Sequence, residues 1–245
     1  MPTRTATVIG GGVMGSGIAQ VLARRGAAVR VREPTEELVE AARGRILDGS
    51  YGLNDAVEGG YLTPGERDDA FDRIECTTDL EAAVDGTDVV IEAVTEDLAT
   101  KGEVFRALDE VTDEQPLYSN TSGFSVTSIA NAVSDPSRVA VMHFFNPVPV
   151  MSLVEIVHAP ETDDSVVEYA ESLVEDLGKT AITISDDPGS YGFVANRCYG
   201  ALRREAERIV DAGIATEAQV DTALEAGYNL PVGPFSLRGI GEEWE

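Results

Sequence analysis

Residues 5–33 constrain the fold of this chain more than any other segment. A short β-branched run leads directly into Gly10-x-Gly12-x-x-Gly15, a stretch with helical apolar spacing follows, and a second apolar strand ends at Glu33. This order of strand, glycine-rich turn, helix and strand is typical of a βαβ unit whose helix N-terminus binds a pyrophosphate. Each part is weak evidence alone, but together they predict a dinucleotide-binding site.

The acidic residue Glu33 indicates which dinucleotide binds. A carboxylate at the end of the second strand accepts hydrogen bonds from the adenosine ribose hydroxyls and repels a 2′-phosphate, which favours NAD over NADP. Arg30 and Arg32 lie nearby and are candidates for holding a phosphate, but their alternation is typical of a solvated strand face. We therefore predict NAD as the cofactor.

The chain is strongly acidic. Among 245 residues it carries 44 acidic and 18 basic side chains, a formal net charge of −26, and its two lysines are Lys101 and Lys179. The acidic residues are dispersed along the chain, which indicates an acidic surface throughout. Such a surface repels itself at low salt and is screened at high salt. We predict a protein from a salt-rich cytoplasm, as in halophilic archaea, with an acidic mesophilic enzyme as the alternative. The charge disfavours nucleic acid as a partner.

Cysteine usage and hydropathy indicate the compartment. Cys76 and Cys198 have neither metal-ligand spacing nor the pattern of a disulfide framework, so reduced thiols are expected. No apolar stretch is as long as a membrane span, and residues 1–4 run directly into the first strand without room for a signal peptide. We expect a cytoplasmic protein without a membrane partner.

Strands and helices alternate along most of the chain, which predicts an α/β fold with a mostly parallel sheet covered on both faces. Asp186-Asp187-Pro188-Gly189 breaks the pattern, and two amphipathic helices follow without a further strand. We therefore expect a Rossmann-type dinucleotide-binding domain over residues 1–187 and a small all-α domain over residues 188–245. The predicted strands are 5–9, 28–31, 88–93, 116–119, 139–142, 153–157 and 181–184; the predicted helices are 18–25, 35–47, one starting at Thr63, 101–111, 126–133, 165–177, 194–211 and 217–226.

Two histidines are the candidates for a general base. His143 ends a predicted strand and is flanked by aromatic residues, whereas the context of His158 is typical of a structural or exposed histidine. Glu155 interrupts an apolar strand twelve residues after His143, where a carboxylate is costly to bury unless it is paired. Either Glu155 faces solvent, or it meets His143, fixes the imidazole tautomer and stabilises the imidazolium. The paired arrangement suits an enzyme that takes a proton from an alcohol while a hydride leaves.

A set of motifs in chain order closely resembles those of the L-3-hydroxyacyl-CoA dehydrogenases, a family that includes 3-hydroxybutyryl-CoA dehydrogenase. The resemblance extends from residue 5 to about residue 240, and the combination is far more specific than any single motif. The motifs are GGGVMGSGIA (10–19), VIEAVTE (90–96), SNTS (119–122), HFFNP (143–147), MSLVE (151–155), GKT (178–180), FVANR (193–197) and PVGPF (231–235).

The resemblance implies reversible, NAD-dependent oxidation of an L-3-hydroxyacyl-CoA to the 3-ketoacyl-CoA, as in fatty-acid β-oxidation, with an acyl-CoA as substrate. It implies that His143 is the catalytic base and Glu155 its partner. It also implies that Ser122 and Asn196 hold the substrate's hydroxyl or carbonyl oxygen, where hydrogen-bond donors stabilise developing charge.

The resemblance assigns further residues to the cofactor. Glu96 and Lys101 match positions that line the cofactor and CoA side of the cleft, whereas Lys179 matches a structural position. No metal is implied. The cofactor-binding residues that the resemblance implies are Gly10, Gly12, Val13, Met14, Gly15, Glu33, Glu96, Lys101 and Asn120.

The chain departs from the family pattern at two places. Ser190-Tyr191-Gly192 stands where the family passes directly from Pro-Gly to Phe, just before Asn196, whose position we expect it to shift. Beyond Phe235 the family has an acidic residue and further helices, so the helical domain is predicted to be shorter here. In relatives that domain forms the dimer interface and one wall of the cleft, which leaves the family's homodimer open for this chain.

Two other functions fit parts of the pattern. A related dehydrogenase of a free hydroxy acid, such as gulonate, has the glycine loop and the histidine but needs no CoA site, so affinity for CoA distinguishes it. A non-catalytic NAD-binding protein is the other alternative. The presence of both His143 and Glu155 argues against it.

Overall fold

The structure, a computed structural model, describes residues 4–237 and divides into two compact units. The first contains the described residues up to Tyr191, and the second begins at Gly192. The last strand of the first unit ends at Ser185, close to the boundary at residues 187 and 188 that the sequence predicts. Within residues 4–237 no helix is long and apolar enough to cross a membrane.

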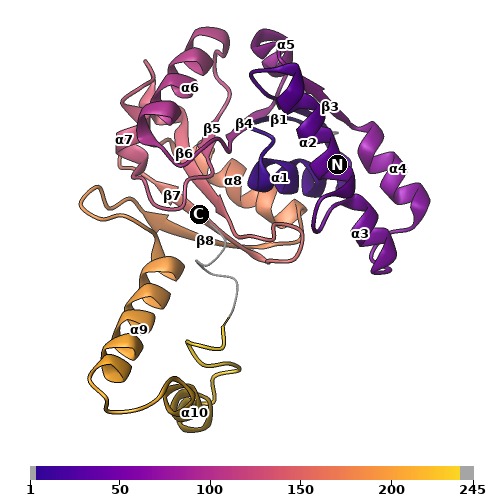
Figure 1. Ribbon diagram of the computed structural model, residues 1–245. Coiled ribbons are helices and arrows are strands. Elements are labelled where there is room, and N and C mark those ends of the chain that lie inside the picture. The colour runs from indigo at the N-terminus through magenta and orange to yellow at the C-terminus, as the bar shows by residue number, and fades with distance from the viewer. Residues whose placement is uncertain (1–3, 238–245) are drawn as a thin grey trace. The chain divides into compact units, whose positions relative to one another are not determined.

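The first unit is built on one sheet of eight described strands in the order β3-β2-β1-β4-β5-β6-β7-β8, with helices on both of its faces (Figure 1). Every neighbouring pair of described strands is parallel except β6 and β7, which are antiparallel. The Rossmann-type α/β fold predicted from the sequence is confirmed. The strands are β1 (Thr5–Ile9), β2 (Ala28–Arg32), β3 (Ile74–Thr77), β4 (Val89–Glu92), β5 (Leu117–Ser119), β6 (Val139–Phe144), β7 (Leu153–His158) and β8 (Thr180–Ser185).

The central strands are buried on both faces because their alternate side chains enter two different core layers. Val8 and Met142 belong to the layer that includes residues of α1, α2 and α8, whereas Val141 lies outside that cluster and is equally buried. The helices of the first unit are α1 (Val13–Arg24), α2 (Glu36–Asp48), α3 (Leu53–Glu58), α4 (Pro64–Asp72), α5 (Leu80–Val84), α6 (Leu98–Val111), α7 (Val126–Ala130) and α8 (Asp164–Asp176).

Some elements differ from the prediction for identifiable reasons. The sequence pattern did not predict β3, an edge strand with one buried side chain, or the two short helices α3 and α5. The apolar spacing predicts that the first helix begins at residue 18, whereas α1 begins at Val13. The first turns of α1 contain Gly15 and Gly17, which have no side chains to show a helical period. The helix expected from Thr63 is present, and Thr63 and Glu66 form its capping box.

The glycine-rich turn lets α1 approach the sheet closely. Gly10 has φ +96°, and a Cβ placed there would lie 2.8 Å from the carbonyl oxygen of Ala93. A Cβ at Gly15 would lie 1.7 Å from the carbonyl oxygen of Gly10. Because these positions carry no side chain, the N-terminus of α1 can lie against the carboxyl ends of β1 and β4, which is the edge where doubly wound sheets bind ligands.

The second unit consists of α9 (Val194–Asp211), α10 (Glu217–Tyr228) and an ordered segment after them. Thr216 and Gln219 form a capping box at the start of α10. Asp221 accepts hydrogen bonds from the Phe235 backbone N–H and the Ser236 hydroxyl. Burial by itself would raise the pKa of its carboxyl, but these bonds hold that pKa below the usual value. The two helices predicted from the sequence are therefore present.

We expect Gly15→Ala to destabilise the protein by about 1–3 kcal/mol, because the added methyl group forces α1 away from the turn. Denaturant unfolding measures this loss. Gly65→Ala, at a position in α4 where nothing lies within 4 Å of an added Cβ, is the control and should not lower the stability. An unchanged midpoint for Gly15→Ala would contradict the close packing described here.

Candidate active site

The N-terminus of α1 is open toward solvent. Gly12 caps the helix without a side-chain hydrogen bond, and no acidic residue lies in the first turn, where Val13 is exposed and Met14 half-buried. A Cβ built at Gly12 has nothing within 4 Å. Unpaired backbone N–H groups at the positive end of a helix, with space in front of them, suit a diphosphate.

Glu33 directly follows β2 beside this turn. Its side chain is buried, and its Oε1 accepts a hydrogen bond of 2.6 Å from the backbone N–H of Gly11. The contact fixes the carboxylate next to the glycine loop, where it accepts hydrogen bonds from ribose hydroxyls. The donors and acceptors of the loop and of Glu33 therefore fit NAD.

A buried charge cluster lies where β4 ends. Glu92 is 0% exposed, and its carboxylate accepts hydrogen bonds from Lys101 Nζ at 2.8 Å and from Ser119 Oγ at 2.6 Å. The Lys101 side chain, on α6, is 1% exposed. Lys101 is therefore a buried cation rather than a surface lysine. Its partner Glu92 has no role in the prediction from the sequence.

Glu96 connects this cluster to the segment after β5 that contains Thr121 and Ser122. Its Oε1 accepts hydrogen bonds from Thr121 Oγ1 at 2.6 Å and from the N–H and Oγ of Ser122 at 2.8 and 3.0 Å, and its Oε2 lies 3.2 Å from Lys101 Nζ. Burial by itself would raise the pKa of Glu96, but the bond from Thr121, the charge of Lys101 and the Ser122 N–H hold that pKa below its usual value. Glu96 is thus an ionised group that fixes Ser122.

His143 and Glu155 face each other across β6 and β7. The two residues are direct partners in the antiparallel register, and His143 Nδ1 lies 2.8 Å from Glu155 Oε2. Glu155 is 0% exposed and His143 is 5% exposed. Directly opposed residues of an antiparallel pair point to the same face, so the register produces the contact. Of the two arrangements that the sequence allowed for Glu155, the structure shows the paired one.

The end of β6 is fixed by a further contact. The Oδ1 of Asn120, after β5, accepts a hydrogen bond of 2.9 Å from the backbone N–H of Phe144, and the Asn120 N–H donates to the carbonyl of Glu92. The ring of Phe145 lies 4.4 Å from the imidazole of His143. Asn120, which the resemblance assigns to the cofactor, thus also positions the strand that carries His143.

The remaining predicted residues are placed as follows. The Ser122 hydroxyl contacts Glu96, and its Oγ also lies 3.4 Å from the hydroxyl oxygen of Tyr191. Lys179 donates to the carbonyls of Val148 and Met151, a structural contact. Asn196 lies in the first turn of α9, in the second unit.

Three residues of this arrangement, Glu92, Thr121 and Tyr191, were not predicted from the sequence. Glu92 ends a wholly apolar strand, and the reasoning that singled out Glu155 would also have found it. Thr121 lies in the motif SNTS (119–122), in which the family resemblance implies roles for Asn120 and Ser122 alone. Tyr191 lies in the segment that departs from the family, 3.3 Å from Glu96 Oε1 and edge-to-face with Phe124.

Comparison with known proteins decides the family. Residues 5–187 match the family model of the 3-hydroxyacyl-CoA dehydrogenase NAD binding domain, and residues 192–239 match that of the C-terminal domain. The chain belongs to the 3-hydroxyacyl-CoA dehydrogenase family. This confirms the family resemblance, the class of enzyme and the NAD cofactor that the sequence predicted. The prediction of a halophilic source is not tested by these matches and stays a prediction.

Similar proteins support the assignment over most of the chain. The 3-hydroxybutyryl-CoA dehydrogenase of Mycobacterium tuberculosis is 43% identical over 236 residues, which are 95% of this chain and 80% of that protein. The human mitochondrial hydroxyacyl-coenzyme A dehydrogenase is 38% identical over 94% of this chain and 74% of its own length. The crystal structure of M. tuberculosis FadB2 has a TM-score of 0.87 and 42% identity, covering 95% of this chain and 80% of that one.

We expect Gly12→Ala to fold with unchanged stability and to bind NADH at least about tenfold more weakly, because its methyl group fills the space in front of the α1 N–H groups. Quenching of protein fluorescence by NADH measures the affinity, and thermal unfolding is the control. Wild-type affinity in this variant would place the diphosphate elsewhere.

Lys101→Met should destabilise the protein by about 3–5 kcal/mol, because Glu92 then stays buried without a countercharge. Denaturant titration measures the loss. The matched control is Arg208→Met, which breaks the exposed pair between Arg208 and Glu205 and should produce no measurable change. Equal midpoints for Lys101→Met and the wild type would contradict a buried ion pair.

Proposed function

We propose that this protein catalyses the reversible, NAD-dependent oxidation of an L-3-hydroxyacyl-CoA to the 3-ketoacyl-CoA, with His143 as general base and Glu155 as its positioning residue. The observation that carries the proposal is the buried contact of 2.8 Å between His143 Nδ1 and Glu155 Oε2. Family membership supplies the class of reaction, and this contact supplies a base of the required kind.

The carboxylate of Glu155 sets the state of the imidazole. Because an ionised carboxylate is an acceptor, it favours the tautomer with the proton on Nδ1, which leaves the ring's lone pair on Nε2. Nε2 of His143 takes the proton of the substrate's C3 hydroxyl, and Glu155 stabilises the imidazolium that results. NAD, held by the glycine-rich turn and Glu33, would supply the acceptor for the hydride from C3, and loss of the proton and the hydride would leave a ketone. In the reverse direction the imidazolium returns its proton to the oxygen.

Ser122 and Asn196 are proposed to hold the C3 oxygen. Glu96 accepts hydrogen bonds from the backbone N–H and the hydroxyl of Ser122 and so fixes the position of this residue. A hydroxyl has a single proton, so to hold the C3 oxygen Ser122 turns that proton from Glu96 to the substrate while its backbone stays in place. Lys101 acts through Glu96 as a positioning residue. Asn196 belongs to the second unit. Its proposed role toward the same oxygen rests on its place in the family motif FVANR (193–197).

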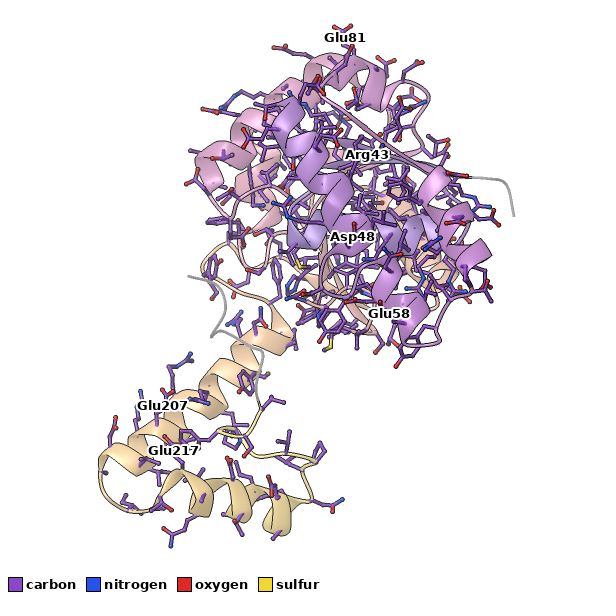
Figure 2. The ribbon with its side chains drawn as sticks, turned by 45° about the vertical axis from the view of Figure 1, so that its right-hand side comes forward. Arg43, Asp48, Glu58, Glu81, Glu207 and Glu217 are labelled. Carbon is purple, nitrogen blue, oxygen red and sulfur yellow. The ribbon has the colours of Figure 1, made fainter. Side chains whose placement is uncertain are left out.

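A salt-rich cytoplasm remains part of the proposal. Exposed carboxylates are spread over both units, as Asp48, Glu58 and Glu81 show in the first and Glu207 and Glu217 in the second (Figure 2). Screening by salt weakens the repulsion among such charges. We expect folding and activity to require molar KCl, and circular dichroism during stepwise dilution of KCl measures that requirement.

The test of the reaction is acetoacetyl-CoA-dependent oxidation of NADH in several-molar KCl. His143→Gln should lower kcat by about 10²–10⁴-fold, because it removes the group that transfers the proton. Glu155→Gln should lower kcat on the order of 10²-fold, because an amide that donates to Nδ1 imposes the wrong tautomer.

The other histidine provides the matched control. His158, whose Nδ1 lies 3.4 Å from the carbonyl oxygen of Ala159, is outside the proposed site, so His158→Gln should keep wild-type kcat. Full activity of His143→Gln would contradict the assignment of His143 as the general base. Turnover of free 3-ketoacids without turnover of acetoacetyl-CoA would instead favour the hydroxy-acid alternative.

A further inference from the structure

A cavity of about 340 Å³ lies at the C-terminal end of α1, the opposite end of the helix from the glycine-rich turn. It is lined by the last turn of α1, by Leu62, by the loop 149–152 and by the turn 177–179 that precedes β8. The cavity takes no part in the chemistry proposed above, and all of its lining belongs to the first unit.

Three cationic side chains meet in this cavity. They are Arg24, Arg25 and Lys179, and none of the described residues that line the cavity is acidic. Burial and the charges of both arginines lower the pKa of Lys179, and burial and the charge of Arg25 lower that of Arg24. The three groups therefore lie within one another's field. In a chain with 44 acidic and 18 basic residues, such a concentration of positive charge opposes the general trend.

The two guanidinium groups lack acceptors. Among residues 4–237 neither Arg24 nor Arg25 makes a side-chain hydrogen bond or an ion pair, although Arg24 is half-buried. Glu66 attracts Arg24 electrostatically, but its carboxylate is engaged by the N–H and hydroxyl of Thr63. A guanidinium carries five donors, and withdrawing it partly from water is unfavourable unless acceptors meet it.

A structural role accounts for part of the cluster. Cations at the C-terminus of a helix interact favourably with its dipole, which explains an arginine in the last turn of α1. The dipole does not explain why Lys179, from a different part of the chain, adds a third charge. Lys179 Nζ donates to the carbonyls of Val148 and Met151, and the resulting cluster keeps a net positive charge toward the cavity.

The geometry points to a diphosphate-bearing ligand: we propose that this cavity binds adjacent phosphate groups through Arg24, Arg25 and Lys179. Guanidinium groups bind phosphate oxygens in pairs, and three cations balance the charge of a diphosphate better than that of a single carboxylate. Val150 is 60% exposed beside the charges and offers an apolar surface to the organic part of the ligand. Such a ligand is either a free nucleotide or the phosphorylated end of the acyl-CoA substrate, and the second case rests on the proposed function.

The first experiment is calorimetric titration of inorganic pyrophosphate into the full chain saturated with NADH, at the lowest KCl concentration that keeps it folded. NADH keeps pyrophosphate out of the glycine-rich turn. We expect one site, with Arg24→Gln and Arg25→Gln each weakening it by about tenfold or more. Arg106→Gln, an exposed arginine of α6, is the control and should bind as the wild type does. The absence of binding to the wild type, or wild-type affinity in both the Arg24→Gln and the Arg25→Gln variant, overturns the proposal.

A second measurement distinguishes the two sources of the diphosphate. If the substrate supplies it, both α1 variants raise KM for acetoacetyl-CoA and leave KM for acetoacetyl-pantetheine, which lacks the nucleotide, unchanged. If a free nucleotide supplies it, both KM values stay unchanged while ADP binding weakens with pyrophosphate binding. Either result upholds the site. Should the wild type turn over no acyl-CoA, the proposed function fails, and the pyrophosphate titration alone decides the cavity.

Discussion

The antiparallel pairing of β6 with β7 is the constraint on which the site depends. In an otherwise parallel sheet, this one reversal sets two residues twelve positions apart directly opposite each other, with Nδ1 of His143 at 2.8 Å from Oε2 of Glu155. A fully buried carboxylate is tolerated only where a partner meets it. A slip of β7 by one residue against β6 would turn Glu155 to the face opposite His143. The fold and the proton chemistry therefore depend on the same register.

The polar groups of the first unit gather along one edge of the sheet. Glu33 follows β2, Glu92 ends β4, Asn120 follows β5 and His143 lies near the end of β6. These strands are parallel, so their carboxyl ends meet at one edge, which is where doubly wound sheets bind ligands. Each of the three buried carboxylates at this site has a nitrogen partner at 2.6–2.8 Å: Gly11 N–H for Glu33, Lys101 Nζ for Glu92 and His143 Nδ1 for Glu155. The apolar strands thus carry three buried carboxylates, and each of these has a polar partner within hydrogen-bonding distance.

The sequence predicted much of this arrangement because its signals are local or periodic. The glycine spacing identified β1, α1 and β2, and a charge inside an apolar strand drew attention to Glu155. Patterns of this kind could not show β3, whose edge position buries a single side chain, or the start of α1, where glycines replace apolar side chains. They also could not show that Lys101 is buried, because its partners lie on β4 and in the turn after it. Contacts between distant elements carry no local signature.

Nitrogen-15 NMR of the imidazole rings tests the central claim most directly. The chain has two histidines, so the spectrum of the protein labelled at histidine contains two rings, and His158 serves as the internal reference. At a pH where both rings are neutral, we predict that His143 carries its proton on Nδ1, with Nε2 unprotonated, and that Glu155→Gln reverses this state. A His143 ring protonated on Nε2 in the wild type would contradict the assignment of His143 as a base held by Glu155.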